Sequence, residues 1–400
     1  MLLRKGIIAG CCLAAIAGVA AFRIAPSPAD EKITPVEPMP GSAFVLEPYL
    51  QFATRTSIVV MCETPTPTTC LLEYGATFPP DKSIAVEKVD TLHEIKLDNL
   101  VPKTKYFYRM VCTDTDGKKL VGKPSTFFTA VDATDAYSFT VIGDTQRNPV
   151  VTGKVAKLMW ERRPNFVVHL GDVVDNGPDK KQWTDDLFKP CAELFARVPV
   201  YPCIGNHEKN HAFYYRYFSL PKPEYYYSFK YGNAEFFSLD TNKSVDSESE
   251  QYKWLDQSLA ASEAKWKICF HHHPCHSSDS DDYGNTEKVN STYGAPKHKH
   301  LIGLYEKHRV DLVMNGHIHA YERTWPIRDQ KVDVKAGVTY LTSGGGGGSL
   351  EPFEPTPAFF KKEQRVDFHY CYFTVHGGTV DCKVFDSNDR LFDQFSLKKE

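Results

Sequence analysis

Five short segments, spread between residues 143 and 319, carry the residue types that bind metal ions. Each follows a run of residues typical of a buried strand. In an open α/β sheet the carboxyl ends of the strands meet at one crevice, so side chains far apart in sequence are expected to lie together there. A glycine before Asp or Asn allows the backbone to turn sharply. The segments are Gly-Asp-Thr-Gln at 143–146, Gly-Asp-Val-Val-Asp at 171–175, Gly-Asn-His-Glu at 205–208, His-His-His-Pro at 271–274 and Gly-His-Ile-His at 316–319.

These segments supply carboxylate, amide and imidazole donors, which are enough to bind two divalent or trivalent ions. Asp172 is the expected bridge, because one carboxylate can bind two ions. None of the segments contains Cys, which argues against a structural zinc finger. Of the 15 histidines, 11 lie between His207 and His319. Each motif alone is weak evidence, because most Gly-Asp turns are ordinary loops, but five in order argue against a chance arrangement.

Only one residue of the histidine triple is expected to reach a metal. Ile268, Phe270 and His272 alternate along the preceding strand and therefore share one face. Pro274 pushes the residue before it into extended geometry. We expect this to turn His273 away from His272.

Beyond residue 135 the chain alternates between predicted strands and predicted helices, a pattern typical of a layered α/β fold. We assign 136–400 to one domain with this fold, which contains all five segments and is the predicted catalytic domain. The C-terminal stretch 368–397 is rich in strands, with a hairpin turn at 376–379. The other strands are predicted at 139–142, 166–170, 200–204, 235–239, 267–270 and 311–314, and the helices at 151–163, 181–197, 249–261 and 297–308.

The region 44–132 shows strands only, separated by Pro, Gly and Asp turns, which favours a small β-sandwich. Within it, 97–106 has a Leu and a Tyr on either side of a Pro turn and resembles a fibronectin type III domain. The region has no cluster of catalytic groups, so we expect a structural role or a role at the edge of the substrate. Its clearest strands are at 57–61, 71–74, 93–97 and 106–111.

The N-terminus, 1–29, is predicted to be a signal peptide or anchor, followed by a Pro-rich linker at 30–43. Its uncharged run, 7–22, would span about 24 Å as a helix, short of a bilayer core of about 30 Å. A cleaved signal is therefore favoured, and the protein is expected to be exported. Cys11 lies in a sequence that also resembles a lipoprotein cleavage site. Nine cysteines lie beyond this leader, and their pairing cannot be deduced from the sequence.

The net charge of −3 over 400 residues gives no basic excess, so nucleic-acid binding is not expected. Membrane contact is expected only through the N-terminal segment, if it is uncleaved or lipidated. The sequence does not predict an oligomeric state.

The five segments in order resemble the signature of the calcineurin-like metallophosphoesterases: D-x-H, G-D-x-x-D, G-N-H-E/D, a single His and G-H-x-H. Residues 315–323 (Asn-Gly-His-Ile-His-Ala-Tyr-Glu-Arg) and the preceding all-β region resemble the purple acid phosphatases. The glycine run 344–348 is similar to a tract in bacterial relatives. Because it lacks the Lys of a phosphate-binding P-loop, we interpret it as a tight loop near the site.

The resemblance implies a dinuclear centre containing Fe, Mn or Zn. Two departures from the family pattern matter. Gln146 stands where the family usually has His or Gly, and an amide oxygen binds metal more weakly than imidazole does. Asp175 stands where purple acid phosphatases have a ligating Tyr. The ligands implied for one ion are Asp144, Gln146, Asp172 and His319, and those for the other are Asp172, Asn206, His272 and His317.

The function implied is an exported phosphoesterase that hydrolyses small phosphate monoesters with a metal-activated water. His207, paired with Asp175, is expected to protonate the leaving group. Arg147 is a candidate phosphate contact, with His273 and His276 as further substrate contacts and Glu208 as part of the loop scaffold. Two alternatives stay open: a phosphodiesterase or nucleotide hydrolase with the same metals, and a non-enzymatic surface binding protein.

Overall fold

The computed structural model describes residues 44–280, 282–284, 290–353 and 357–400. The predicted leader, 1–29, and linker, 30–43, lie outside these residues, as does Cys11. The described residues belong to one compact unit. Among them, no helix is both long and apolar enough to cross a bilayer.

The all-β region begins with a strand, β1, that is followed by two long ones. The predicted strands 57–61 and 71–74 are parts of a single strand, β2, which corrects the prediction. Pro65 and Pro67 suggested a break, but they fall where the register between β2 and β3 shifts, between Glu63 and Thr68, so no ladder hydrogen bond is lost there. The strands are β1 (Leu46–Gln51), β2 (Ile58–Gly75), β3 (Lys82–Leu97), β4 (Lys105–Asp114), β5 (Lys119–Val121) and β6 (Ser125–Phe128).

Cys70 and Cys112 are opposite each other on β2 and β4 and form a disulfide. The other cysteines of the described residues are free and buried. The disulfide lies in the core of the all-β region, which Leu72, Met110 and Phe127 also help to form.

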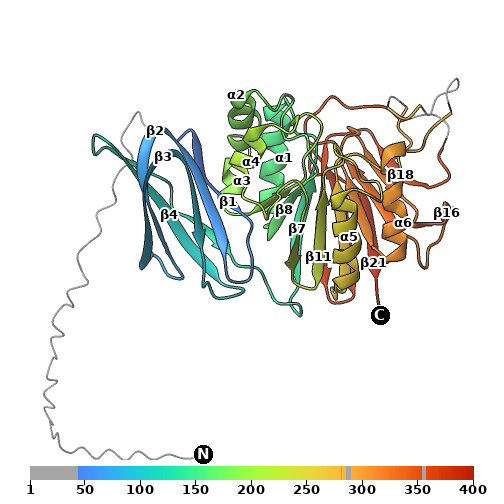
Figure 1. Cartoon of the computed structure of the whole chain (residues 1–400), viewed down its shortest axis with the longest axis horizontal. Helices are drawn as coiled ribbons and strands as arrows, with labels where there is room; N and C mark the ends of the chain where they lie inside the picture. Colours follow the sequence, from blue (N-terminus) through green and yellow to red (C-terminus); the bar gives the residue numbers. More distant parts are fainter. Residues whose placement is uncertain (1–43, 281, 285–289, 354–356) are drawn as a thin grey trace, which may run out of the picture. The chain divides into compact units, whose positions relative to one another are not determined.

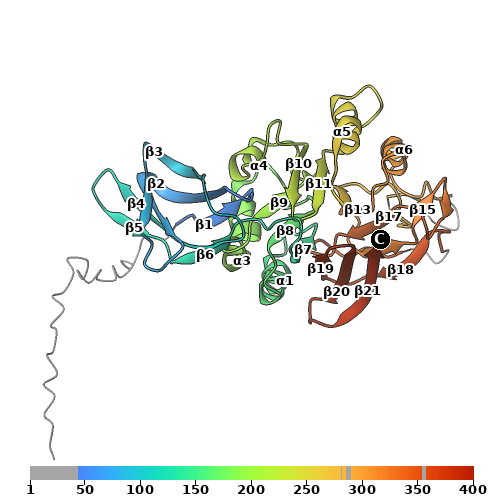
Figure 2. The same cartoon turned by 90° about the horizontal axis from the view of Figure 1, so that it is seen from below.

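Two sheets face each other in the α/β region, and helices cover their outer faces (Figures 1 and 2). Phe139 and Phe236, one from each sheet, meet edge to face with ring centroids 5.3 Å apart. The next residue, Phe237, lies on the opposite face and packs in a second core with Leu255 and Leu301 from two helices. This alternation along a strand places one core between the sheets and another under the helices.

The first sheet has the order β21-β20-β19-β7-β8-β9-β1 and continues into β2, β4 and β5. β1 pairs with β9 through Gln51 and Val200 and with β2 on its other side, so one sheet runs through both regions. A division into separate domains at 132–136, and the likeness to fibronectin type III, therefore stay predictions. The strands are β7 (Tyr137–Ile142), β8 (Phe166–His169), β9 (Val200–Pro202), β19 (His369–His376), β20 (Thr379–Asp386) and β21 (Leu391–Lys398).

The second sheet has the order β10-β11-β12-β13-β17-β14-β18, with β11, β12, β13 and β17 parallel. A two-stranded ribbon lies outside it. The strands are β10 (Tyr227–Tyr231), β11 (Ala234–Leu239), β12 (Trp266–His271), β13 (Leu312–Asn315), β14 (Tyr321–Thr324), β17 (Thr339–Ser343) and β18 (Lys361–Arg365), and the ribbon is β15 (Ile327–Arg328) with β16 (Lys331–Val332).

The helix predicted at 181–197 is wrong as a single element. The chain there forms α2 (Lys180–Gln182), a π-helical stretch (Trp183–Phe188) and α3 (Ala192–Phe195), and Pro190 separates the last two. Proline has no N–H to donate and clashes with the preceding turn, which ends the helix. The other helices are α1 (Pro149–Glu161), α4 (Ala212–Tyr217), α5 (Glu250–Ala261) and α6 (His300–Lys307), the last preceded by a 3₁₀ turn (Pro296–His298).

The contacts between the two regions predict how their stabilities are linked. Tyr49 of β1 is 2 % exposed, lies 4.6 Å from Phe188 between ring centroids, and donates to the Tyr217 carbonyl. We expect Tyr49→Ala to lower the free energy of unfolding by about 3–5 kcal/mol, measured by denaturant unfolding. The metal content of the folded variant should not change. Val101→Ala, at a 59 % exposed position, is the control and should change stability by at most about 0.5 kcal/mol.

Candidate metal centre

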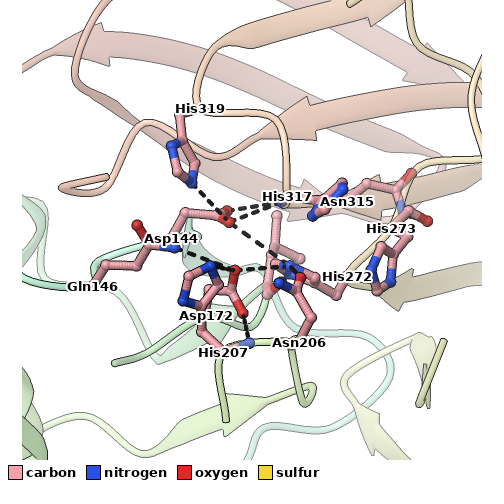
Figure 3. Close-up of polar contacts among 12 residues, drawn as sticks. Asp144, Gln146, Asp172, Asn206, His207, His272, His273, Asn315, His317 and His319 are labelled. Atoms are coloured by element: carbon pink, nitrogen blue, oxygen red, sulfur yellow. Dashed lines mark hydrogen bonds and ion pairs between the residues drawn. The ribbon is translucent and has the colours of Figure 1, made fainter. Parts of the chain in front are cut away.

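All five segments singled out in the sequence follow strands, and their side chains converge (Figure 3). They come from the ends of β7, β8 and β9 in the first sheet and of β12 and β13 in the second. The metal-binding atoms of Asp144, Asp172 and His272 lie within 4.8 Å of one another. Those of His272, His273 and His317 do so as well. The two groups share His272, so the donors form one continuous cluster.

Asp172 lies at the centre of one side of this cluster. Its Oδ2 is 3.1 Å from His272 Nε2, and its Oδ1 accepts the backbone N–H of His207 at 2.9 Å. The Gln146 amide lies 3.3 Å from Asp172 Oδ2 through Nε2. The Asn206 amide oxygen is 2.9 Å from His272 Nε2. A single carboxylate therefore contacts residues from three other segments.

Asp144 anchors the other side of the cluster. Both of its oxygens accept the backbone N–H of His317, at 2.9 and 3.0 Å. His319 Nε2 lies 3.7 Å from Asp144 Oδ1, and His272 Nε2 lies 4.0 Å from the same oxygen. Asp144 is completely buried. Two imidazoles from the second sheet thus face a carboxylate from the first.

The charges of this cluster are unbalanced in a way that suits a multivalent cation. Burial, together with the charge of Asp172, raises the pKa of Asp144 well above its usual range. Burial also favours the neutral form of Asp172, but His272 and His207 outweigh it and lower the pKa of Asp172 to about 2. Two buried carboxylates side by side repel each other, and divalent ions with oxygen and imidazole ligands relieve that repulsion.

The ligand positions share an uncommon backbone conformation. Asp144, Gln146, Asp172 and His317 have φ of +57°, +37°, +51° and +72°. Left-handed backbone costs free energy for residues with a Cβ, and such residues concentrate at functional sites.

Glycines allow the turns to approach one another closely. A Cβ on Gly205 would lie 2.1 Å from Asp172 Oδ1, and one on Gly316 would lie 2.5 Å from Asp144 Oδ2. In the glycine run 344–348, a Cβ on Gly348 would lie 2.6 Å from His319 Cε1. The Gly348 N–H also donates to the Asp144 carbonyl at 2.8 Å. The run is therefore a tight loop packed against the centre.

The outer nitrogens of two imidazoles are already bonded. His272 Nδ1 donates to the Leu170 carbonyl at 2.8 Å, and His319 Nδ1 donates to the Ser349 carbonyl at 2.7 Å. In each ring the lone pair is then on Nε2, the nitrogen that faces the carboxylates. This is how metal-binding histidines are commonly held. The residues present therefore fit a dinuclear metal centre.

Glu208 ties the second and third segments together. Its carboxylate accepts the backbone N–H groups of Asp172 at 3.0 Å, Val173 at 2.8 Å and Gly205 at 2.5 Å. It is completely buried, and burial together with the charge of Asp172 raises the pKa of Glu208 to about 8. It contacts backbone at both turns, which is the arrangement of a scaffold residue.

His207 is next to Asp175, but the shorter contact is to the main chain. His207 Nδ1 donates to the Asp175 carbonyl oxygen at 2.7 Å, whereas the carboxylate lies 3.5 Å away. The carboxylate also pairs with Arg147, whose Nη2 is 3.2 Å from Asp175 Oδ1 and whose side chain is 66 % exposed. The peptide carbonyl, which no substitution removes, thus sets the tautomer of His207.

His273 does not turn away from the cluster, contrary to the expectation from Pro274. Its ring centroid is 4.4 Å from that of His317, and its Nδ1 is 2.9 Å from Thr241 Oγ1. Burial and the neighbouring His272 lower the pKa of His273 far below its usual range, so it is neutral.

His276 does not reach the centre as a substrate contact. It is 2 % exposed and packs against Tyr340 and Phe360, with ring centroids 4.4 and 5.4 Å away. Burial lowers its pKa to about 3. The chain turns inward after Cys275, itself buried, so His276 lies in the core under the helices.

Two contributors to the site, Thr241 and Asp282, were missed by sequence reasoning, and Asn315 was noted only as part of the stretch 315–323. Asn315 Nδ2 lies 2.9 Å from both Nδ1 and the carbonyl of His271, which joins the ends of β12 and β13. Thr241 contacts His273, and Asp282 contacts His317. Asn315 stands directly before the Gly-His-Ile-His segment, which could have drawn attention to it. Thr241 and Asp282 have no such signal. Thr241 and Asp282 line a cleft of about 910 Å³ beside the centre, whereas Asn315 does not.

The comparisons with known proteins agree with this geometry. Residues 137–321 match the family described as calcineurin-like phosphoesterase. Over these residues the chain is similar to that superfamily. This match, together with the acid phosphatases described next, confirms the predicted enzyme class, a metal-dependent phosphoric ester hydrolase.

The chain is also similar to purple acid phosphatases. It is 27% identical over 354 residues to acid phosphatase type 7 of Danio rerio, covering 78% of this chain and 79% of that protein. It is 29% identical over 294 residues to purple acid phosphatase 21 of Arabidopsis thaliana, covering 68% and 61%. Some other Arabidopsis matches are named probable inactive purple acid phosphatases, so turnover needs a direct measurement.

A solved structure shows the same fold. Purple acid phosphatase PPD1 from yellow lupin (Lupinus luteus) seeds superposes with a TM-score of 0.77 at 19% identity, covering 88% of this chain and 74% of that one. The predicted fold class, an α/β metallophosphoesterase core preceded by an all-β region, is confirmed.

The close approach at Gly205 gives a test of the centre. A methyl group in Gly205→Ala would displace Asp172, and we expect the variant to lose at least one equivalent of metal, measured by elemental analysis. Gly303→Ala is the matched control. Apart from its chain neighbours and the backbone of its own helix, nothing lies within 4 Å of the added Cβ, so metal content should be unchanged. Full metal content in Gly205→Ala would show that Asp172 does not hold the ions.

Proposed function

We propose that this protein is an exported dinuclear phosphatase that hydrolyses small phosphate monoesters. The observation that carries the proposal is the convergence of two overlapping donor groups, with Asp144, Asp172 and His272 in one and His272, His273 and His317 in the other. Carboxylates with imidazoles in one buried cluster are the donors expected for Fe, Mn or Zn.

The proposed ligands are those implied by the resemblance to the metallophosphoesterases, and their side chains lie in one cluster. When bound, the two ions would polarise the phosphoryl oxygens and lower the pKa of a water. Gln146, with its amide turned to present oxygen, would be the weakest ligand, because an amide is a poorer donor than imidazole or carboxylate. Asp144, Gln146, Asp172 and His319 would hold one ion, and Asp172, Asn206, His272 and His317 the other.

His207 is the proposed general acid. Its Nδ1–H is bonded to the Asp175 carbonyl, and Nε2 lies 3.9 Å from Asp172 Oδ2, so Nε2 is the nitrogen on the side of the centre. Its side chain is 33 % exposed, which allows proton exchange with solvent. A protonated Nε2 would donate to the leaving oxygen. Arg147, mostly exposed and tethered to Asp175, would contact phosphate oxygens from the rim.

The cleft of about 910 Å³ supplies space for the organic part of the ester. It is lined by His273 and His317 on the side of the centre and by Lys243, Lys297 and His300 further away. His273, neutral and close to His317, would contact the leaving group. Such a cleft is large enough for a small-molecule substrate.

Export is supported by two features. The leader predicted at 1–29 has the pattern of a signal peptide. The Cys70–Cys112 disulfide is typical of proteins that fold in an oxidising compartment.

Removal of the ions tests the proposal directly. Purified protein should contain about two ions per chain, lose its phosphatase activity when a chelator removes them, and regain it when Zn²⁺, Mn²⁺ or Fe is returned. A monoester, a diester and a nucleotide should be assayed in parallel, and the monoester should be hydrolysed fastest. Full turnover by metal-free protein would contradict the proposal. Faster hydrolysis of the diester would instead assign a phosphodiesterase, and metal binding without turnover a binding protein.

Substitutions at His207 and Asp175 test the proton donor. His207→Ala should lower kcat by about 10²–10⁴-fold, as expected for loss of a general acid, with metal content unchanged. Asp175→Asn should cost less, because the Nδ1–H of His207 still donates to the main-chain carbonyl. Loss of one metal equivalent in Asp175→Asn would show that Asp175 is a ligand and would remove it from the acid pair.

A further inference from the structure

A carboxylate lies on the outer side of one proposed metal ligand. Asp282 Oδ2 is 2.8 Å from His317 Nε2. The side chain of Asp282 is 46 % exposed and that of His317 is 18 % exposed. Asp282 lies in no motif of the sequence, and none of the roles proposed above uses it.

This contact determines which nitrogen of His317 is left for an ion. Asp282 Oδ2 lies within hydrogen-bond distance of His317 Nε2, and an aspartate carboxylate accepts hydrogen bonds. The proton of a neutral His317 ring is therefore on Nε2. The lone pair is then on Nδ1, and the neutral ring with a free lone pair is the form that binds metal.

His272 and His319 are held in the same way, except that the roles of Nδ1 and Nε2 are exchanged. In those rings Nδ1–H donates to the carbonyls of Leu170 and Ser349, and Nε2 faces the carboxylates. Each of the three imidazoles thus has an acceptor on one nitrogen and a free lone pair on the other. For His317, the acceptor is a side chain.

The local structure holds Asp282 in place. Its N–H donates to Asp279 Oδ2 at 2.8 Å, and Asp279 forms a β-bridge with Phe353. One residue earlier, the Ser278 N–H donates to the buried carboxylate of Glu322 at 3.0 Å. Glu322 is in β14, which begins two residues after His319. The segment that carries Asp282 is therefore attached to the strand beside the proposed ligands. A half-exposed contact between two such side chains contributes little to stability, so its main effect is to orient the His317 ring.

We propose that Asp282 is a positioning residue that holds the His317 ring with Nδ1 directed at one of the two ions. The proposal rests on the proposed function in one respect, since it requires that the centre binds metal. Without the carboxylate, Nε2–H loses its partner and the ring is free to rotate. The ion that His317 binds should then be held more weakly. The ion held by Asp144, Gln146 and His319 should be affected much less.

Metal titration of the full chain tests this without relying on turnover. Chelator-treated wild type, Asp282→Asn and Asp282→Ala are titrated with Zn²⁺ against a competing chromophoric chelator. We expect Asp282→Ala to bind one of two ions about 10–100-fold more weakly, as is typical when such a partner of a ligating histidine is removed. Asp282→Asn should lose less, because its amide oxygen still accepts from Nε2. The thermal stability of the metal-free variants should match that of metal-free wild type.

Asp256→Asn is the matched control. Asp256 also accepts a hydrogen bond from a histidine Nε2, that of His308, but the pair joins α5 to the residue after α6 and includes no proposed ligand. This variant should bind both ions as wild type does. Equal binding constants in wild type and Asp282→Ala would overturn the proposal while leaving the proposed function intact. Weaker binding in Asp256→Asn by the same factor would also overturn it. A wild type that binds no Zn²⁺ would instead contradict the proposed function itself.

Discussion

Two carboxylates buried side by side at the ends of β7 and β8 are the constraint on which the rest of the site depends. Asp144 and Asp172 are both within 4.8 Å of the same His272 nitrogen, and both are almost inaccessible to water. Burying two like charges is costly unless cations or hydrogen-bond donors compensate them. The backbone N–H groups of His207 and His317 supply part of this compensation. The remainder must come from imidazoles and bound ions, which is why the histidines gather here.

The local backbone is shaped to keep the carboxylates in position. The left-handed turns at Asp144 and Asp172 are strained, and such strain persists only where surrounding contacts impose it. Here Glu208 fixes the turn at Asp172 through its backbone N–H groups, and the glycine run 344–348 packs on the turn at Asp144. The centre is therefore held by main-chain hydrogen bonds from several elements.

The five metal-binding segments were visible in the sequence because each follows a strand and combines glycine with a donor residue. Contacts that join elements through the main chain carry no such signal. The pairing of β1 with β9 could not be predicted from the sequence, because Gln51 and Val200 pair through the backbone. His276 was predicted to contact substrate, but the turn after Cys275 places it in the core. For His207, the sequence predicted Asp175 as the partner through its carboxylate. In the structure the main-chain carbonyl of Asp175 makes the closer contact.

This difference between main-chain and side-chain partners determines what substitution can change. The tautomers of His207, His272 and His319 are set mainly by carbonyl groups, which every residue at those positions supplies. Glu351 lies 3.4 Å from His319 Nδ1, further away than the carbonyl that already accepts its proton. At His317 the acceptor is the carboxylate of Asp282, on a segment outside the five motifs. A change there alters the charge and the position of the acceptor together. If Asp282 positions His317 as proposed, substitution at residue 282 is therefore expected to change the affinity of this centre without loss of a ligand.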